Sequence, residues 1–375
     1  MKLFLFLTQV LAAQTLTLET FSSSTHFDSA SSTGIWNLVE ERIELPRIID
    51  RDDDGGEDET INLGDGSDGE FSPATFAAFD TNAGATPTTV TLDSSRVYQF
   101  TTFSLPSGYS LFGTGSSPLR IRVQGSVSVG GTIDLSGSDG ENSGSPGTVS
   151  DGGTGTCGGQ NGGDGGHTSG DAEDGGDGNT ATSVGGGTGG SDNATASDNY
   201  APSGGGGGHS AAGSDGGNGS GGSAPLTKGV GGSSYGDVYL STLYGGSGGG
   251  GGGQSVSISG PLGSGGGGGA GGGALLITGG SDITVESGAS ITVSGGDGGD
   301  EGTARAGGGG GGSGGAVGLL SGGSITYSGT LDGRKGQGGE MGPMEDLEQS
   351  ILRVRFRPRE PLTQHFLRQG KVTTP

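Results

Sequence analysis

The 375-residue chain has little of what builds a conventional globular core, because only 27% of its residues are hydrophobic and 5% aromatic. An ordinary soluble domain is about 45–50% apolar, so a large conventional core is not expected. Cysteine is nearly absent: Cys157 stands alone, which excludes an intramolecular disulfide and a zinc site built from Cys. Basic residues are outnumbered, with 17 Lys and Arg against 41 Asp and Glu and a net charge of −24. Phosphate binding needs a basic footprint, so nucleic acid is not expected as a partner.

Long hydrophobic runs are missing too, and no transmembrane segment is expected. The longest apolar run, Leu3 to Val10, follows a basic start at Met1-Lys2 and is followed by the small residues Ala12-Ala13. This pattern predicts a secretory signal peptide over residues 1–13, and hence a secreted, extracellular or cell-surface location. The alternative is a buried N-terminal helix or strand.

What the chain has in abundance is glycine, 94 residues without a collagen triplet. After the signal peptide we distinguish a polar acidic segment (14–85), a Gly-rich β domain (86–342) and a basic C-terminal tail or cap (343–375). Within 351–375 the alternation Leu352-Arg353-Val354-Arg355-Phe356-Arg357 indicates an amphipathic strand. This strand could cap the β domain or face the acidic body of another copy; the alternative is a poorly ordered tail.

A sequence pattern of three short strands, the strand phrase, is repeated within the Gly-rich domain. Residues 118–137, 274–296 and 316–333 each contain three short β-branched runs separated by Gly-containing turns. Internal repeats of this kind are typical of stacked architectures. We therefore predict an all-β fold, a right-handed parallel β-helix (solenoid) with long Gly-rich loops; the alternative is a β-sandwich with disordered Gly-rich insertions. The expected inward-facing ladder residues are Ile121, Val123, Val127, Val129, Ile133 and Leu135.

The glycine runs lie directly before copies of the phrase, as in Gly265–Gly273 before Ala274 and Gly307–Gly315 before Ala316. Two outcomes are open for them. They are either disordered loops or polyproline-II-like strands, in which only glycine lets backbones approach closely enough to hydrogen-bond.

The strand phrases, the block over 235–253 and the two glycine-led phrases over 265–296 and 307–333 resemble a family of uncharacterised glycine-rich surface or secreted proteins of bacteria with complex envelopes. The resemblance covers roughly residues 97–340. It implies a parallel β-helix with long Gly-rich loops and no established enzymatic activity. Members of that family often carry a lipoprotein Cys near the N-terminus, which this chain lacks.

One candidate metal site stands in the acidic segment. Asp50, Asp52 and Asp54 fit the start of a calcium loop of the EF-hand kind, and Asp58 falls at its ninth position. The acid expected at the twelfth position is missing, because Ile61 stands there. Ca²⁺ is the only cofactor the sequence suggests, and a solvated acidic run is the alternative. Gly-Gly-Asp-Gly phrases around Asp164, Asp177 and Asp297 also resemble calcium-binding turns, out of register with the known nonapeptide.

No catalytic centre is predicted. The four histidines, His26, His167, His209 and His365, show no metal-ligand spacing. Asp134 lies near Arg120 and Arg122 in sequence, as in β-helix polysaccharide lyases and hydrolases, but a turn Asp and solvated arginines explain them equally well.

The sequence therefore favours a non-enzymatic structural or adhesive protein of the cell surface, with itself (as an oligomer, rod or fibre) or a surface polysaccharide as partner. A carbohydrate-binding adhesin is the alternative, and a polysaccharide-degrading enzyme a more distant one.

Overall fold

The computed structural model describes residues 62–82, 88–145, 147–167, 174–180, 182–192, 200–219, 226–236, 240, 242–257, 260–301 and 305–339, together with four short strands before residue 45. The chain divides into two compact units, residues 1–60 with 359–375 and residues 61–358. In the first unit, β1 (Phe4–Phe6) pairs antiparallel with β2 (Thr17–Glu19), and β3 (Asn37–Val39) with β4 (Arg42–Glu44).

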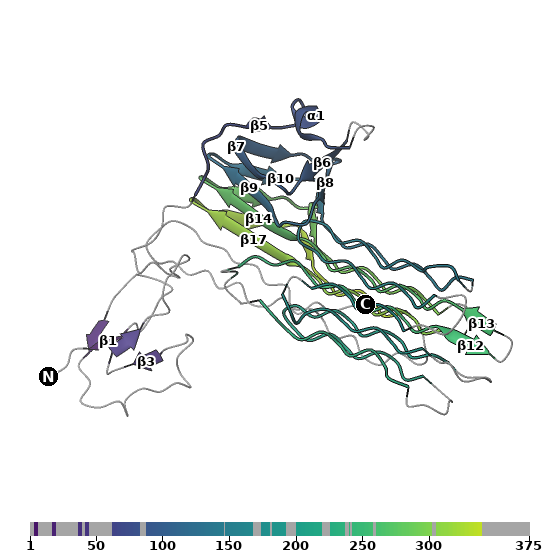
Figure 1. The fold of residues 1–375 in the computed structure, drawn as a ribbon. Helices are drawn as coiled ribbons and strands as arrows, with labels where there is room; N and C mark the ends of the chain where they lie inside the picture. The colour runs from purple at the N-terminus through teal and green to yellow at the C-terminus, as the bar shows by residue number, and fades with distance from the viewer. Residues whose placement is uncertain are drawn as a thin grey trace. The chain divides into compact units, whose positions relative to one another are not determined.

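The second unit contains two parallel sheets, whose strands are drawn in Figure 1. The larger sheet curls into a nearly closed, barrel-like arrangement with a seam, and its strand order runs β17-β14-β9-β7-β10-β15-β18, with β5 also paired to β7. The smaller has the order β19-β16-β11-β8-β6. The larger sheet consists of β5 (Gly69–Phe71), β7 (Val97–Leu105), β9 (Leu119–Val123), β10 (Val127–Val129), β14 (Ala274–Gly279), β15 (Ile283–Val285), β17 (Ala316–Ser321) and β18 (Ile325–Tyr327). The smaller consists of β6 (Thr89–Asp93), β8 (Ser110–Thr114), β11 (Thr132–Asp134), β16 (Ser290–Thr292) and β19 (Thr330–Asp332).

The three copies of the strand phrase are direct neighbours in these sheets. Each strand of one copy pairs in register with the same strand of the next, so the aliphatic positions meet in rows. The expected inward-facing residues are all at most 1% exposed and form the core. The rows are Ile121–Ile277–Leu319, Val127–Ile283–Ile325 and Ile133–Ile291–Leu331.

The predicted right-handed parallel β-helix is nevertheless wrong. The reason lies in β7, a nine-residue strand whose first half pairs with β9 and whose last three residues pair with β10. This one strand joins two strand stacks into a single curved, barrel-like sheet. The alternative β-sandwich is wrong as well, because every strand pair in the two sheets is parallel, whereas a sandwich is built from antiparallel sheets.

Aromatic side chains close one end of the sheets. The short helix α1 (Phe76–Phe79) follows β5, and the Phe76 ring packs 4.5 Å from that of Phe71. Phe71 also stacks on Phe103 at 4.5 Å between ring centroids. At the opposite end the last strands are β17, β18 and β19.

Of the two outcomes open for the glycine-rich stretches, disordered loops and polyproline-II-like strands, the structure has ordered, hydrogen-bonded segments. They leave the sheets as long extended segments that run side by side in a bundle (Figure 1). Every described residue of 245–255 and 263–279 is buried. A short antiparallel hairpin, β12 (Ser255–Ser257) with β13 (Gly260–Gly263), lies at the far end of the bundle.

Hydrogen bonds in the bundle recur every three residues. In the central segment 246–253, donors three positions apart bond to the same neighbouring segment, while successive donors bond to different ones. Three residues per turn without internal hydrogen bonds is also the repeat of a polyproline II helix. Gly246, Gly249 and Gly252 donate to Gly272, Gly269 and Gly266; Gly250 and Gly253 donate to Gly205 and Pro202; Gly248 and Gly251 donate to Asn179 and Gly176.

In the part of the chain that the structure describes, no helix is both long and apolar enough to cross a membrane.

Candidate functional site: the acidic rim of the glycine bundle

The interior of the bundle has room for backbone and almost nothing else. A Cβ added at Gly312 would overlap the carbonyl oxygen of Ala270, and one at Gly162 that of Gly268. Most of the few interior side chains are small, chiefly alanines and serines; two of the serines, Ser150 and Ser264, are hydrogen-bonded to each other at 2.9 Å. Larger side chains are therefore carried at the outside of the bundle, where any contact with another molecule must take place.

Carboxylates occupy regular places at this outside. We call the five exposed residues Asp139, Asp164, Asp177, Asp215 and Asp297 the acidic rim. In each, one carboxylate oxygen accepts a backbone N–H from a neighbouring segment at 2.7–3.0 Å. The rim therefore ties adjacent segments together. The second carboxylate oxygen of Asp215 pairs with the Lys228 ammonium at 3.2 Å, and the other four aspartates are exposed at the surface.

Two members of the rim form a relay across three segments. Asp139 accepts the N–H of Asp297 at 2.7 Å, and Asp297 accepts the N–H of Gln337 at 2.7 Å. A similar bond joins Asn142 to the N–H of Asp300 at 2.9 Å. The amide acceptor of Asn142 shows that this role needs an oxygen, and not a charge.

Local contacts shift the pKa of some carboxyls near the bundle. The pKa of Asp215 is lowered by the Gly231 N–H bond and by the Lys228 ammonium, 3.2 Å away. The pKa of Asp192 is raised, first by burial and then by the neighbouring Asp174 carboxylate. Asp174 accepts the backbone N–H of Asp192 at 2.7 Å, so the two acids are held together by the fold.

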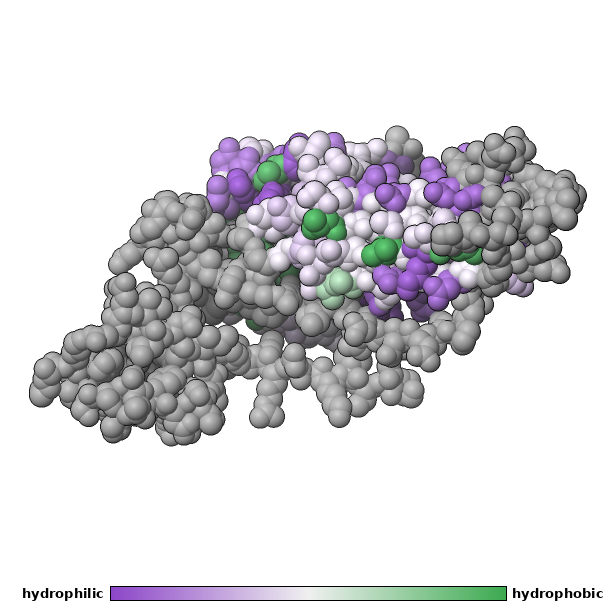
Figure 2. All heavy atoms as spheres, turned by 60° about the horizontal axis from the view of Figure 1, so that its bottom comes forward, coloured by the Kyte–Doolittle hydropathy of each residue, from purple (hydrophilic) through white to green (hydrophobic). Residues whose placement is uncertain are grey.

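Apolar side chains stand singly on the bundle surface. Figure 2 shows isolated hydrophobic residues on a pale surface with hydrophilic patches around them. The exposed large apolar residues of the bundle are Val149, Val184, Tyr200 and Val230. Scattered residues of this kind are normal for a protein surface and define no apolar docking patch.

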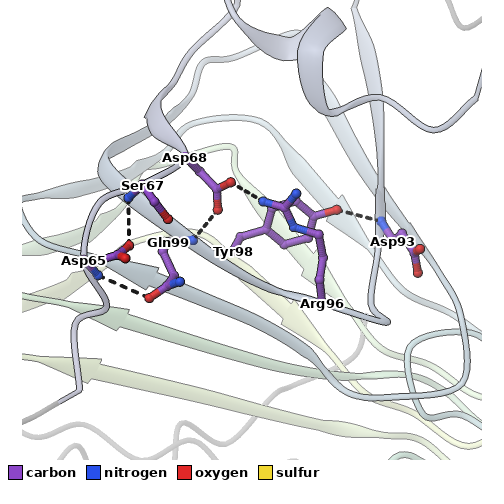
Figure 3. A network of polar contacts seen from close by, with 7 residues as sticks. All are labelled: Asp65, Ser67, Asp68, Asp93, Arg96, Tyr98 and Gln99. Atoms are coloured by element: carbon purple, nitrogen blue, oxygen red, sulfur yellow. Dashed lines mark hydrogen bonds and ion pairs between the residues drawn. The ribbon is translucent and has the colours of Figure 1, made fainter.

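A second polar cluster lies at the start of the sheets (Figure 3). Arg96 forms an ion pair with Asp68, and its guanidinium lies 4.5 Å above the Tyr98 ring. Asp68 also accepts the Gln99 N–H at 2.7 Å, and the Tyr98 hydroxyl accepts the Asp93 N–H at 2.9 Å. These bonds fasten the segment before β5 to the β6–β7 turn, which is a structural role.

The lone cysteine is a core residue. Cys157 is fully buried and packs in the main hydrophobic cluster. Burial raises the pKa of its thiol to about 11. Its Sγ occupies the space that a side chain at Gly113 would need.

The sequence-predicted metal ligands Asp50, Asp52, Asp54 and Asp58 lie outside the described residues. Within the described ranges, no group of three or more His, Cys, Asp or Glu is placed to hold a metal ion. Asp164, Asp177 and Asp297, which resembled calcium-binding turns, bond instead to backbone N–H groups. The Gly-Gly-Asp-Gly phrase could have indicated this bonding, because a short Asp side chain readily reaches a nearby backbone N–H.

The other residues considered for chemistry are not brought together. His167 contacts its local backbone at Gly165, and the His209 ring packs edge-on against Tyr235 at 4.9 Å. Asp134 accepts the N–H of Ser136 two residues on. Arg120 and Arg122 alternate with the buried residues of β9 and are half-buried. His26 and His365 lie outside the described residues.

No protein-family model, curated protein or solved structure matches this chain significantly. The resemblance to glycine-rich bacterial surface proteins therefore stays a prediction.

Proposed function

We propose that this protein is a secreted or cell-surface structural and adhesive protein, in which the glycine bundle is a rigid body that presents the acidic rim to other surfaces. The observation that carries the proposal is the rim itself. Its carboxylates are fixed by backbone hydrogen bonds on a body whose interior excludes side chains. Fixed groups lose little conformational freedom on binding, which favours many weak contacts in parallel.

The charge of the chain supports an extracellular, multivalent role. A net charge of −24 keeps copies apart in solution and attracts cationic or cation-bridged polymers. The sequence pattern at residues 1–13 supports export. Contacts made by exposed carboxylates weaken as salt rises, because exposed charges are screened within about 10 Å at 0.1 M salt.

Location is tested first, by raising an antibody to the purified chain and fractionating the cells that make it. We expect the protein in the medium or on the cell surface, with a mature N-terminus near Gln14 on sequencing. An intact chain beginning at Met1 and confined to the cell interior would contradict the proposal.

Adhesion is tested with beads that carry the purified chain, incubated with envelope material from the same cells. A rim variant replaces the five rim aspartates by Asn, which keeps each acceptor oxygen and removes five charges. The matched control replaces Asp52, Asp53, Asp54, Glu57 and Asp58 by Asn or Gln, the same charge change in the acidic segment. We expect the rim variant to bind at least about threefold less, and the control to bind like wild type.

Equal binding by the rim variant, the control variant and wild type would show that the acidic rim takes no part in adhesion. The control also measures the Asp50–Asp58 calcium candidate, since it should lose any Ca²⁺ affinity that the segment has.

A carbohydrate-binding adhesin is the second candidate. One observation favours it: the Tyr200 ring is 38% exposed, and the Arg305 guanidinium lies 5.9 Å from it. Exposed rings stack on apolar sugar faces. Glycan-array binding that Tyr200→Ala abolishes, with the rim variant unaffected, would select this alternative.

A further inference from the structure

Two arginines on the outer face of β9 have no partner. Arg120 and Arg122 alternate with the buried apolar residues of this strand and are themselves half-buried. In the part of the chain that the structure describes, neither side chain forms a hydrogen bond or an ion pair. Burying part of a charge costs free energy unless an opposite charge or a hydrogen bond compensates it. Two such arginines are unusual in a chain with 41 acidic residues.

The other basic side chains that the structure describes between residues 62 and 339 each contact a partner. The partners are Asp68 for Arg96, Asp215 for Lys228, the Tyr200 ring for Arg305, Asp332 for Arg334 and Ser214 for Lys335. The two arginines of β9 therefore differ from the rest, and an anion that would pair with them has to come from another molecule.

The sheet holds these two side chains at a fixed spacing. β9 is hydrogen-bonded to β7 on one side and to β14 on the other. Residues two apart on a strand lie on the same face with Cα atoms about 6.6 Å apart. Because both edges of β9 are paired, a peptide cannot add to it as a further strand. A ligand at this place is recognised by side chains alone.

The neighbouring strands supply a border and a further donor. On β14, Leu276 and Thr278 lie beside the two arginines and are buried. On β7, Gln99 lies beside Arg122, and its Oε1 accepts the Asp65 N–H at 3.2 Å (Figure 3). The amide nitrogen of Gln99 is then left to donate. The border is an outer apolar cluster of Leu243, Ala274, Leu276, Ala316 and Leu320, with Leu240 beside it.

The carboxylates of the segment next to Gln99, residues 62–68, are bonded to other groups. Asp65 accepts the Ser67 N–H at 2.9 Å, and Asp68 is paired with Arg96. This segment therefore leaves the positive charge of the β9 arginines available to an anion.

We propose that Arg120, Arg122 and Gln99 form a binding site for the anionic groups of an acidic polysaccharide. Each guanidinium presents a planar fork of N–H donors that matches the oxygens of a carboxylate or a sulfate. Two forks at a fixed spacing suit a polymer whose acidic groups repeat along an extended chain, because neighbouring repeats rebind as one is released. The site is separate from the acidic rim and from Tyr200, so it goes beyond the function proposed above.

The net charge of −24 repels a polyanion at long range, and salt decides how far that repulsion reaches. At about 0.15 M ionic strength the Debye length is about 8 Å, so remote aspartates contribute little, whereas groups in direct contact are screened less. Binding is therefore measured at this ionic strength.

Binding of the full chain to two polymers tests the proposal: polygalacturonate carries carboxylates and dextran sulfate carries sulfates, with neutral dextran as the blank. The site variant combines Arg120→Gln with Arg122→Gln. The matched control combines Arg334→Gln with Lys335→Gln, which removes the same two charges elsewhere. We expect wild type to bind at least one of the two polymers, the control to bind within twofold of wild type, and the site variant to bind at least tenfold more weakly. The polymer that binds identifies the anionic group.

Equal binding by the site variant and the control, or no binding of either polymer by wild type, would overturn the proposal. Tighter binding of polyglutamate than of both polysaccharides would overturn it too, because the site would then belong to an acidic protein. The rim variant described above should bind the polymers at least as tightly as wild type. Binding lost in the rim variant alone would overturn this inference and leave the proposed function intact.

Chemical footprinting decides the question even if the site variant fails to fold. Phenylglyoxal modifies accessible arginines of the wild-type chain, and mass spectrometry of its peptides reports on each of them. We expect saturating polymer to slow the modification of Arg120 and Arg122 at least fivefold and to leave that of Arg334 within twofold. Equal slowing of all three, or of none, would contradict the proposal.

Discussion

Asp139 accepts the backbone N–H of Asp297 at 2.7 Å, 158 residues away in sequence, and Asp297 in turn accepts the N–H of Gln337. The Asp side chains of the glycine-rich phrases are thus structural acceptors in addition to surface charges. The two roles can be separated, because Asn keeps the acceptor oxygen and loses the charge.

We therefore expect Asp297→Ala to lower the free energy of unfolding by about 1 kcal/mol, because the Gln337 N–H loses its partner. Asp297→Asn should stay within about 0.5 kcal/mol of wild type. Urea unfolding followed by circular dichroism measures both. Equal losses for the two variants would show that charge, and not the hydrogen bond, is what the position contributes.

Two adjacent glycines give opposite expectations. A Cβ at Gly207 would overlap the carbonyl oxygen of Ser247, which is backbone and cannot turn away, whereas the nearest atom to a Cβ at Gly206 is 3.5 Å distant. Gly207→Ala should destabilise the bundle by about 3 kcal/mol or more. Gly206→Ala should change stability by less than about 1 kcal/mol, since it reduces the freedom of the unfolded chain. Thermal unfolding of the two single variants decides this, and a similar loss in both would mean that the segments are not so closely packed.

The thiol of Cys157 should be unreactive in the folded protein. Burial raises its pKa to about 11, so at pH 8 about a hundredfold less thiolate is present than for an exposed cysteine. Reaction with a thiol reagent should be at least about a hundredfold slower than in urea. Fast labelling of the native chain would contradict the buried position.

The raised pKa of Cys157 also sets a dependence of stability on pH. The folded state keeps its proton to about pH 11, while the unfolded chain loses it near pH 9, so the unfolded state binds fewer protons in between. The stability that the buried, protonated thiol contributes is therefore fully present below about pH 9. The free energy of unfolding falls as the pH rises from there toward 11. Cys157→Ala should abolish the fall between pH 9 and 10. Above pH 10 a fall should persist, because burial also raises the pKa values of Tyr235 and Tyr327 to about 12.

The cluster in Figure 3 contains both a partly buried hydrogen bond, from the Gln99 N–H to Asp68, and a surface ion pair between Asp68 and Arg96. Asp68→Ala should cost about 1–3 kcal/mol, because the Gln99 N–H loses its acceptor. Arg96→Gln should cost less than about 1 kcal/mol, because the Arg96 side chain is half exposed and its ion pair is screened. Denaturant unfolding of both variants is the measurement, and a larger loss for Arg96→Gln would reverse the assignment.

Much of the core could be predicted from the sequence because its pattern is local. The alternation in 119–135 predicts which side chains point inward, and Ile121, Val127 and Ile133 are indeed buried. The path of the sheets could not be predicted in this way. It depends on β7 pairing with β9 and β10 at once, and a strand's length does not reveal how many partners it has.

The acidic rim shows the same division. The sequence indicated that Gly-Gly-Asp-Gly phrases recur, and calcium was the nearest known use for them. Their actual partners are backbone N–H groups supplied by segments up to 158 residues away, which no local spacing encodes.

By itself, the sequence determined which residues build the sheets and which build the bundle. Apolar residues at alternate positions form strands, and long glycine runs permit backbones to touch. Only the tertiary structure decided that the larger of the two sheets curls into a nearly closed, barrel-like arrangement and that the glycine runs pack together in a bundle. The physical reason is that a glycine segment without side chains has no preferred partner of its own. Its hydrogen bonds are satisfied only when the sheets hold other segments beside it at the right spacing.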